Sequence, residues 1–190
     1  MMDSLEAQRT ISRYRGDALV VPTMTTNAEW PQVSTAPDLD MPLAGAMGKA
    51  SSVALGLALA RPERKVFILD GDGSLLMNLG SLITIAGMAP PNLYHFVFQN
   101  NVYRVSGGQP IPGAGKFNFA ILAKGAGYAA AYEYKTLRNF QKALPQILGR
   151  PGPALICLHV PPAKERSPYP MATAVQGLPR VRAALAKAKG

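Results

Sequence analysis

The sequence predicts an α/β fold: a three-layer α/β/α domain with a mostly parallel central sheet. Two observations lead to this prediction. Short apolar runs alternate with helix-like segments along the 190 residues, which is the order of right-handed βαβ units. The runs are continuously apolar, as expected of strands that are buried on both faces. Ligands of such folds bind beyond the carboxyl ends of the strands, so a site is expected in the turns that follow them.

In the first third of the chain, periodicity and turn residues place the elements. Residues 3–14 are amphipathic and predict a helix, and the apolar run 18–21 predicts a short strand that ends at Pro22. The stretch 23–42 is rich in turn residues and lacks periodicity, which indicates a loop. Residues 45–60 are mostly Ala, Leu and small residues, and predict a helix packed closely against the sheet.

The rest of the chain continues the alternation. The predicted elements are, in order, strand 65–69, helix 74–87, strand 93–98, loop 100–115, helix 117–126, strand 129–132, helix 137–148, strand 154–159, a proline-rich link over 161–170 and a helix over 178–189. The length suits one domain with its own core. We therefore expect a single domain over residues 1–190, with a proline-linked C-terminal helical segment from about residue 171.

Composition restricts the class of protein. Hydrophobic residues make up 48% of the chain and charged residues 16%, which fits a compact domain whose surface is partly covered by a partner. No apolar run is long enough to cross a bilayer, and the polar N-terminus lacks a secretory signal. A single cysteine excludes an internal disulfide, so we expect a cytoplasmic protein. Cys157, His95 and His159 lie in apolar strands and are expected to be buried structural residues.

The formal net charge of +9 raises the question of nucleic acid. The basic residues are scattered along the chain, no run of lysines alternates with aromatic residues, and no nucleic-acid-binding signature is present. An anionic ligand or an acidic partner explains the charge at least as well. We therefore expect no binding to nucleic acid.

The most informative stretch is Gly71-Asp72-Gly73-Ser74, which comes directly after a predicted strand. Glycines let the backbone approach phosphates closely, and the start of the following helix offers free N–H groups. An acidic residue in such a pocket repels phosphate unless a cation lies between them. Mg²⁺ is commonly shared in this way between a few protein oxygens and phosphates. Taken alone, Gly-Asp-Gly is also a common turn.

A second source of oxygen ligands is Gln99-Asn100-Asn101, after the predicted strand 93–98. Residues 74–99, which are 26 positions, separate it from the first motif. That spacing accommodates one helix and one strand, so the two loops should lie side by side at adjacent strand ends. The amide oxygen of an asparagine is a hard neutral ligand that suits Mg²⁺ beside one carboxylate.

The pair of motifs resembles the cofactor-binding motif of thiamine diphosphate (ThDP)-dependent enzymes. Residues 71–110 are particularly similar to the β chain of sulfopyruvate decarboxylase and to phosphonopyruvate decarboxylase. The resemblance runs from about residue 18 to 160 and is strongest over 41–110. It implies the ThDP-binding fold, ThDP and Mg²⁺ as cofactors, and decarboxylation of a small anionic 2-oxo acid.

In this family the acid and the asparagine bind Mg²⁺ through their side chains, and a backbone carbonyl two residues later completes the protein ligands. The resemblance thus implies Asp72, Asn100 and the carbonyl of Val102. Aligning the terminal pair of the motif instead selects Asn101, but the alignment on Tyr103 needs no gap and favours Asn100. Contacts to the cofactor are further implied for Thr25, Gly71, Gly73, Ser74, Tyr103 and Arg104. Arg104 could alternatively pair with an anionic substrate tail or with a partner surface.

A second matching feature is the segment from Gly45 to Gly48. In the family, a bulky apolar residue at this place forces the two rings of ThDP into a V shape, and Met47 falls at that position. The backbone N–H of Met47 and the carbonyl of Gly45 would hold the aminopyrimidine ring, so that the cofactor acts as its own base. The alternative is that Met47 is an ordinary core residue.

One expected residue is missing. The family needs a glutamate near the pyrimidine ring, contributed by a separate pyrimidine-binding domain. Glu29 and Glu133 are the candidates in this chain, and neither lies in a matching context. We therefore expect the glutamate on a partner α-type subunit, in a hetero-oligomer such as α2β2, and an inactive isolated chain. A carboligase of the acetolactate synthase kind and a non-catalytic interaction module remain the alternatives.

Overall fold

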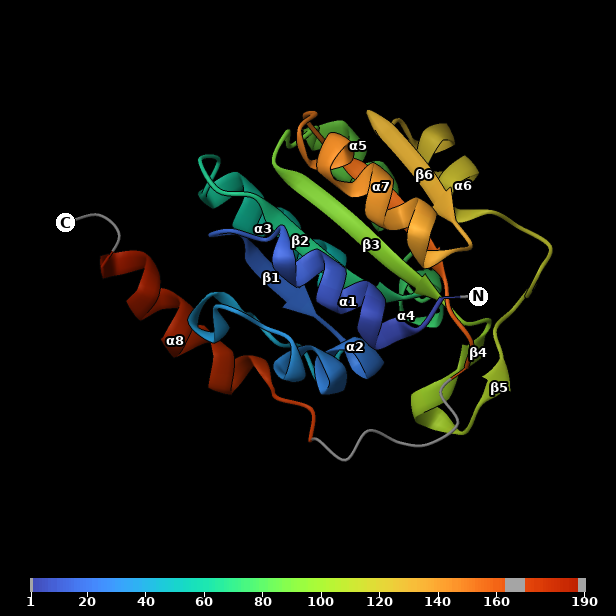
Figure 1. The fold of residues 1–190 in the computed structure, drawn as a ribbon, viewed down its shortest axis with the longest axis horizontal. Coiled ribbons are helices and arrows are strands. Elements are labelled where there is room, and N and C mark those ends of the chain that lie inside the picture. The colour runs from blue at the N-terminus through green and yellow to red at the C-terminus, as the bar shows by residue number, and fades with distance from the viewer. Residues whose placement is uncertain (1, 163–169, 188–190) are drawn as a thin grey trace.

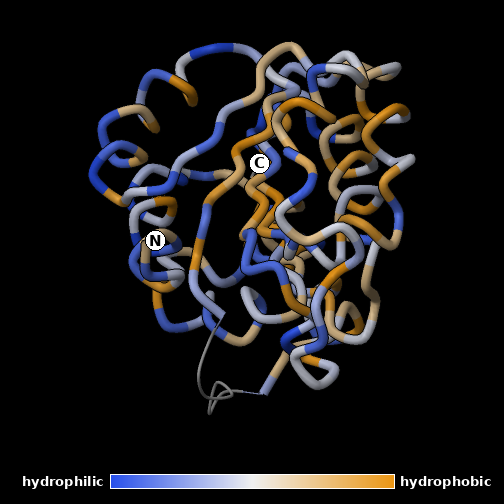
Figure 2. The backbone as a smooth tube through the Cα atoms, turned by 90° about the vertical axis from the view of Figure 1, so that its right-hand side faces the viewer, coloured by the Kyte–Doolittle hydropathy of each residue, from blue (hydrophilic) through white to orange (hydrophobic). Residues whose placement is uncertain are grey.

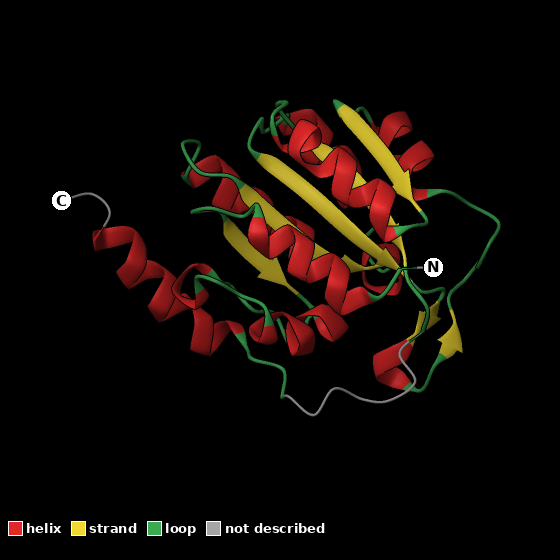
Figure 3. Ribbon diagram, in the orientation of Figure 1, coloured by secondary structure: helices red, strands yellow, loops and turns green. Residues whose placement is uncertain are grey.

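Five parallel strands form the central sheet of the computed structural model, which describes residues 2–162 and 170–187. Their spatial order is β1-β2-β3-β7-β6, and every neighbouring pair is parallel (Figure 1). The strands are β1 (Leu19–Pro22), β2 (Val66–Gly71), β3 (Leu93–Gln99), β6 (Ala130–Tyr134) and β7 (Ala154–His159). The predicted fold class is confirmed, because helices connect these strands and cover both faces of the sheet (Figure 3).

Helices pack on the sheet through two separate apolar cores. On one face lie α3 (Ala50–Ala60), α5 (Ser81–Met88) and α6 (Phe119–Ala126). On the other lie α1 (Ser4–Arg13) and α7 (Leu137–Leu148). Successive residues of a strand point to opposite faces, so each strand must be apolar throughout to supply both cores. In Figure 2, hydrophobic segments accordingly run through the middle of the molecule.

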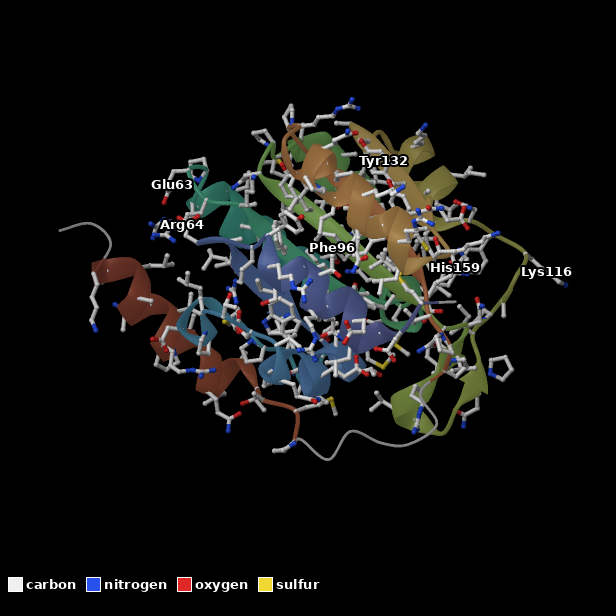
Figure 4. All side chains as sticks on the ribbon, in the orientation of Figure 1. Glu63, Arg64, Phe96, Lys116, Tyr132 and His159 are labelled. Carbon is white, nitrogen blue, oxygen red and sulfur yellow. The ribbon has the colours of Figure 1, made fainter. Side chains whose placement is uncertain are left out.

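Strand β2 illustrates this division. Ile68 belongs to the core beneath α3, whereas Phe67 and Leu69 belong to the core beneath α1 and α7. All three side chains are completely buried. Phe96 of β3 packs edge-on against Phe67 and Phe140 in the second core (Figure 4).

The prediction of one continuous loop over residues 23–42 is wrong. The segment contains α2 (Met24–Glu29) and two short 3-10 helices, η1 (Trp30–Gln32) and η2 (Pro37–Leu39). Helix α2 begins because the Thr23 and Thr26 side chains satisfy each other's backbone N–H groups, as a capping box does. All three elements are shorter than two turns, which is too short for apolar periodicity to reveal them.

Two predicted helices have different limits. The helix expected from residue 45 begins only at Ala50, because Gly45 and Gly48 adopt φ values of 68° and 75°, outside the right-handed helical region. The helix expected over 74–87 is divided into α4 (Asp72–Leu76) and α5 by a turn at residues 77–80. Because α4 is short, the partial positive charge at its N-terminus is smaller than that of a long helix.

Two other segments also differ from expectation. The loop expected over 100–115 contains an antiparallel hairpin, β4 (Val102–Tyr103) and β5 (Gln109–Pro110), with the 3-10 helix η3 (Arg104–Ser106) between its strands. The last helix, α8 (Ala174–Lys187), begins four residues before the predicted start. Within the proline-rich link, residues 163–169 lie outside the described residues, as do residues 188–190 of the predicted last helix. No described helix is long and apolar enough to span a membrane.

The buried positions predicted for Cys157 and His95 are confirmed, but that for His159 is wrong. Cys157 is 1% exposed, and burial, with the charges of Glu133 and Asp72, raises the pKa of its thiol to about 12. His95 is fully buried beside the carboxylate of Asp70, 3.5 Å away. His159 instead ends β7 half-buried, and its Nε2 lies 2.5 Å from Glu133 (Figure 4).

Candidate functional site

A cleft opens where β1, β2 and β3 end, the edge at which α/β folds bind ligands. Its empty space amounts to about 590 Å³ when the solvent-open mouth is included. Most of the residues predicted for the site line this cleft: Thr25, Met47, Gly71, Asp72, Gly73, Ser74, Asn100, Val102, Tyr103 and Arg104. Gly45 and Asn101 are not among the lining residues. The fold thus brings four separate segments of the chain to one cleft.

Asp72 joins the two motifs at the base of the cleft. Its Oδ1 accepts a hydrogen bond from the backbone N–H of Gly73 at 2.8 Å. Its Oδ2 accepts from the N–H groups of Asn100 at 2.9 Å and Asn101 at 2.6 Å. Burial raises the pKa of Asp72, although these three hydrogen bonds oppose the shift. A cation bound beside this carboxylate would favour its ionised form.

The two asparagines occupy different environments. Asn100 lines the cleft, and its side-chain oxygen accepts from the N–H of Val102 at 3.0 Å. Asn101 has a φ of 63°, and its side-chain oxygen accepts from Nε2 of Gln99 at 2.9 Å. Gln99 in turn accepts from the buried thiol of Cys157. Both amide oxygens thus accept one hydrogen bond, and of the two residues it is Asn100 that lines the cleft.

The chemistry of the donors suits a hard cation. A carboxylate, an amide and a backbone carbonyl are available from Asp72, Asn100 and Val102, and Mg²⁺ prefers such oxygen ligands. No cluster of three or more His, Cys, Asp or Glu side chains that could hold a metal is found in residues 2–162 and 170–187. A cation at this site would therefore complete its coordination with water or ligand oxygens. A Cβ built at Gly71, which lines the cleft, meets no atom within 4 Å, so the backbone here is open to a close-fitting ligand.

The turn that carries Met47 is attached to the first motif and to the turn that follows it. The N–H of Gly48 donates to Oγ of Ser74 at 3.1 Å, and Asn78 donates to the carbonyl of Gly48 at 2.9 Å. A Cβ at Gly48 would lie 3.1 Å from the Cβ of Asn78, so only glycine permits this close approach. The interruption between α4 and α5 has a consequence here, because it brings Asn78 to the turn.

The hairpin β4–β5 closes another wall of the cleft by packing on the first motif. A Cβ built at Gly73 would lie 2.6 Å from two ring atoms of Tyr103. The tyrosine ring therefore rests directly on the glycine backbone. Glycine is therefore required at position 73 for the contact with Tyr103, in addition to any close approach of the backbone to a phosphate.

A polar group whose contacts no sequence pattern indicates lines the cleft from α1 and α2. Oε2 of Glu29 accepts hydrogen bonds from Oγ of Ser4 at 2.7 Å and from Nε2 of Gln8. Ser4 and Glu29 both line the cleft. Burial raises the pKa of Glu29, although the two hydrogen bonds oppose the shift. No signal in the sequence pairs these residues, since α1 and α2 meet only after folding. Glu133, the other acid that we considered, is not among the lining residues.

We expect Glu29 to make stability depend on pH. Its pKa in the folded protein is raised above the ordinary value of 4.5, so its contribution is fully present below that value and is lost as pH rises through the folded-state pKa. Glu29→Gln, which does not titrate, should therefore gain stability relative to wild type between pH 4 and pH 7. Urea unfolding at both pH values measures this difference. Glu6→Gln, exposed on α1, is the control, and a wild-type advantage that grows with pH would contradict the assignment.

The fold and the cleft define a class of protein. A parallel sheet with glycine turns at its strand ends, and with carboxylate and amide oxygens at the base of a cleft, is characteristic of α/β domains that hold a phosphate group together with a divalent cation. Comparison with known families narrows this class. Residues 31–158 match the family described as thiamine pyrophosphate enzyme, C-terminal TPP binding domain. The chain belongs to this family, and thiamine pyrophosphate is another name for ThDP.

Relatives and a solved structure agree with the family. The chain is 38% identical over 157 residues to phosphonopyruvate decarboxylase of Streptomyces viridochromogenes, over 82% of this chain and 38% of the relative. It is 41% identical over 113 residues to sulfopyruvate decarboxylase subunit beta of Methanothermobacter thermautotrophicus, over 57% of this chain and 58% of the relative. Benzoylformate decarboxylase from Polynucleobacter necessarius has the same fold, with a TM-score of 0.71 at 19% identity over 85% of this chain and 34% of that one. The chain spans less than two thirds of the length of each relative.

Proposed function

We propose that the chain is the ThDP- and Mg²⁺-binding subunit of a heteromeric 2-oxo acid decarboxylase of the sulfopyruvate and phosphonopyruvate decarboxylase kind. The observation that carries this proposal is the meeting of Asp72 and Asn100 at adjacent strand ends, in a cleft that Met47 also lines. A fold kept only as an interaction module has no physical need for such a set of oxygen ligands.

Each lining residue has a proposed task. Asp72, Asn100 and the carbonyl of Val102 would hold Mg²⁺, whose charge would offset that of the diphosphate. Gly71, Gly73 and Ser74 contact the diphosphate from the first motif, and Tyr103 contacts it from the hairpin. Thr25 contacts it from α2. The hydroxyl of Ser74 also accepts the hydrogen bond of Gly48, so it couples the diphosphate end of the cleft to the Met47 turn.

The ring end of the cofactor is assigned to Met47 and Gly45. Met47 supports the bent conformation, and its N–H together with the carbonyl of Gly45 orients the aminopyrimidine. When it is bound, ThDP supplies the nucleophilic carbon and the electron sink that decarboxylation of a 2-oxo acid requires. The protein contributes orientation and exclusion of water, both of which depend on the rigidity of the attached turn.

A partner subunit completes the active site in this proposal. It provides the glutamate that activates the pyrimidine, because Glu29 is engaged by Ser4 and Gln8 and Glu133, held by His159, is not among the residues that line the cleft. The name of the relative, subunit beta, supports a split enzyme. An α2β2 assembly in the cytoplasm is the arrangement that we propose.

The test is release of CO₂ from sulfopyruvate, phosphonopyruvate and pyruvate, with ThDP and Mg²⁺ present. We expect turnover by the chain copurified with its partner from the host, and none by the chain alone. A longer hydroxyketone in place of CO₂ and an aldehyde would reassign the protein to the carboligases. A chain that binds neither ThDP nor a partner would sink the proposal.

Arg104 is proposed to recognise the anionic tail of the substrate. It lines the cleft beside Tyr103, on η3, and guanidinium groups pair well with sulfonate and phosphonate oxygens. In the active complex, Arg104→Ala should raise KM for sulfopyruvate or phosphonopyruvate roughly 10- to 100-fold. This ratio corresponds to the free energy that one hydrogen bond to a charged group contributes. KM for pyruvate, which lacks the tail, should stay within about twofold. Arg138→Ala, exposed on α7, is the control, and equal losses for all three acids would place Arg104 on the cofactor instead.

A further inference from the structure

The C-terminal helix α8 packs against the segment that leads to the Met47 turn. Gly177 and Val181 are its buried residues, and Val181 belongs to the core beneath α3 together with Met41 and Leu43. Figure 1 shows α8 running along the β1 side of the molecule, far from β6. The helix is therefore part of the packed structure and is not a free tail.

Gly177 makes the closest of these contacts. A Cβ built at this position would overlap the ring of Pro42 and lie 3.4 Å from the carbonyl oxygen of Asp40. The backbone of α8 thus touches the segment 40–43 directly. Because a proline ring cannot move aside as a flexible side chain does, any side chain at 177 must push the helix and this segment apart.

The segment 40–43 leads directly into the Met47 turn. It is attached to β1 by hydrogen bonds from the N–H of Met41 to Val20 and from the N–H of Leu43 to Pro22. Thr23 also donates to the carbonyl of Leu43 at 2.9 Å. The turn is therefore held at one end by Leu43 and at the other by Gly48, and α8 supports the first of these ends.

A second contact joins the residues before α8 to α2, which is the other segment that lines the cleft next to β1. Nδ2 of the buried Asn27, on α2, donates to the carbonyl of Ala172 at 2.7 Å, immediately before α8. Helix α2 carries Thr25, which lines the cleft. The C-terminal segment thus contacts both chain segments that bound the cleft next to β1, whereas Asp72 and Asn100 are held by β2 and β3.

We propose that α8 positions the Met47 turn and thereby aligns the ring half of ThDP, with Gly177 as the positioning residue. The inference rests on the proposed function, because it assigns that turn to the rings. Displacing α8 should consequently weaken the contacts to the rings while the diphosphate end of the cleft stays intact. Affinity for ThDP and affinity for inorganic pyrophosphate then respond differently, which a general loss of stability would not produce.

The experiment is calorimetric titration of the full chain with ThDP and with inorganic pyrophosphate, each in excess Mg²⁺. For Gly177→Ala we expect about tenfold weaker binding of ThDP and pyrophosphate affinity within about twofold of wild type. Gly56→Ala is the matched control: it is also in a helix, it is exposed, and a Cβ there meets no atom within 4 Å. If Gly177→Ala does not fold, Val181→Ala, which removes buried side-chain packing of α8 in the core that contains Met41 and Leu43, should show the same selective loss.

The remaining outcomes are distinguishable. Equal losses for both ligands, or no loss for either, would overturn the role of α8. Wild-type chain that binds ThDP no better than pyrophosphate would overturn it as well, because this chain would then not hold the rings. If the wild-type chain binds neither ligand, the proposed function itself is wrong.

Discussion

Asp72→Ala is expected to lower the affinity for ThDP in the presence of Mg²⁺ by at least about 100-fold, since residues that only support a metal ligand already account for 10- to 100-fold. The substitution removes the carboxylate that accepts hydrogen bonds from both motifs at the base of the cleft. Without it, the proposed cation site keeps only neutral oxygens from Asn100 and Val102. The chain should stay folded, because the carboxylate of Asp72 takes no part in either apolar core.

Calorimetric titration with ThDP in Mg²⁺ and again in a chelator measures this effect. Wild type should lose its affinity in the chelator, and Asp72→Ala should be insensitive to it. Asp38→Ala, which changes an exposed aspartate on η2, should behave as wild type, and circular dichroism shows whether each variant is folded. If Asp72→Ala still binds ThDP in a Mg²⁺-dependent way with unchanged affinity, the metal site does not lie in this cleft.

Arg15→Met should lower the free energy of unfolding by about 3–5 kcal/mol, which is typical when one partner of a buried ion pair is lost. The Arg15 side chain is 1% exposed and lies 2.7 Å from Oδ1 of Asp40, whose side chain is 9% exposed. It also donates to Oγ of Ser34 at 2.9 Å and to the carbonyl of Ala18 at 2.8 Å. Methionine fills similar space but leaves the charge of Asp40 buried without a cation.

Urea unfolding of both proteins at pH 7 tests the prediction. Arg9→Met is the matched control, because Arg9 on α1 forms an ion pair with Glu6 in which both side chains are nearly half-exposed, and such pairs contribute less than about 1 kcal/mol. Equal, small effects of the two substitutions would show that Asp40 finds another partner or is hydrated. Asp40 is the first residue of the segment 40–43 that contacts α8. The ion pair therefore also helps to hold the segment that leads to the Met47 turn.

Much of the site could be predicted because its signals are local. Asp72 lies between two glycines directly after an apolar strand, and Asn100 directly follows the next. In a parallel sheet, consecutive strands joined by one helix place such residues side by side. The position predicted for Met47 came from the family resemblance, which the glycines on either side of it carry.

Other features could not be predicted, because residues distant in sequence create them. The break between α4 and α5 is stabilised by Asn78 reaching Gly48, 30 positions away. Glu29 acquires its environment from Ser4 and Gln8 on another helix. His159 is the last residue of an apolar strand, yet it is only half-buried, because the sheet ends there and Glu133 of β6 becomes its neighbour.

Local patterns in the sequence are enough to predict the alternation of the main strands and helices, the three layers and the two motifs, because apolar periodicity and glycine turns act within a few residues of one another. The tertiary structure alone decided that Asn100 faces the cleft while Asn101 is bound by Gln99. It also decided that α8 docks beside the cleft, through a hydrogen bond between residues 145 positions apart. The physical reason is that a hydrogen bond or a close packing contact depends on the relative placement of whole elements, which no local pattern encodes.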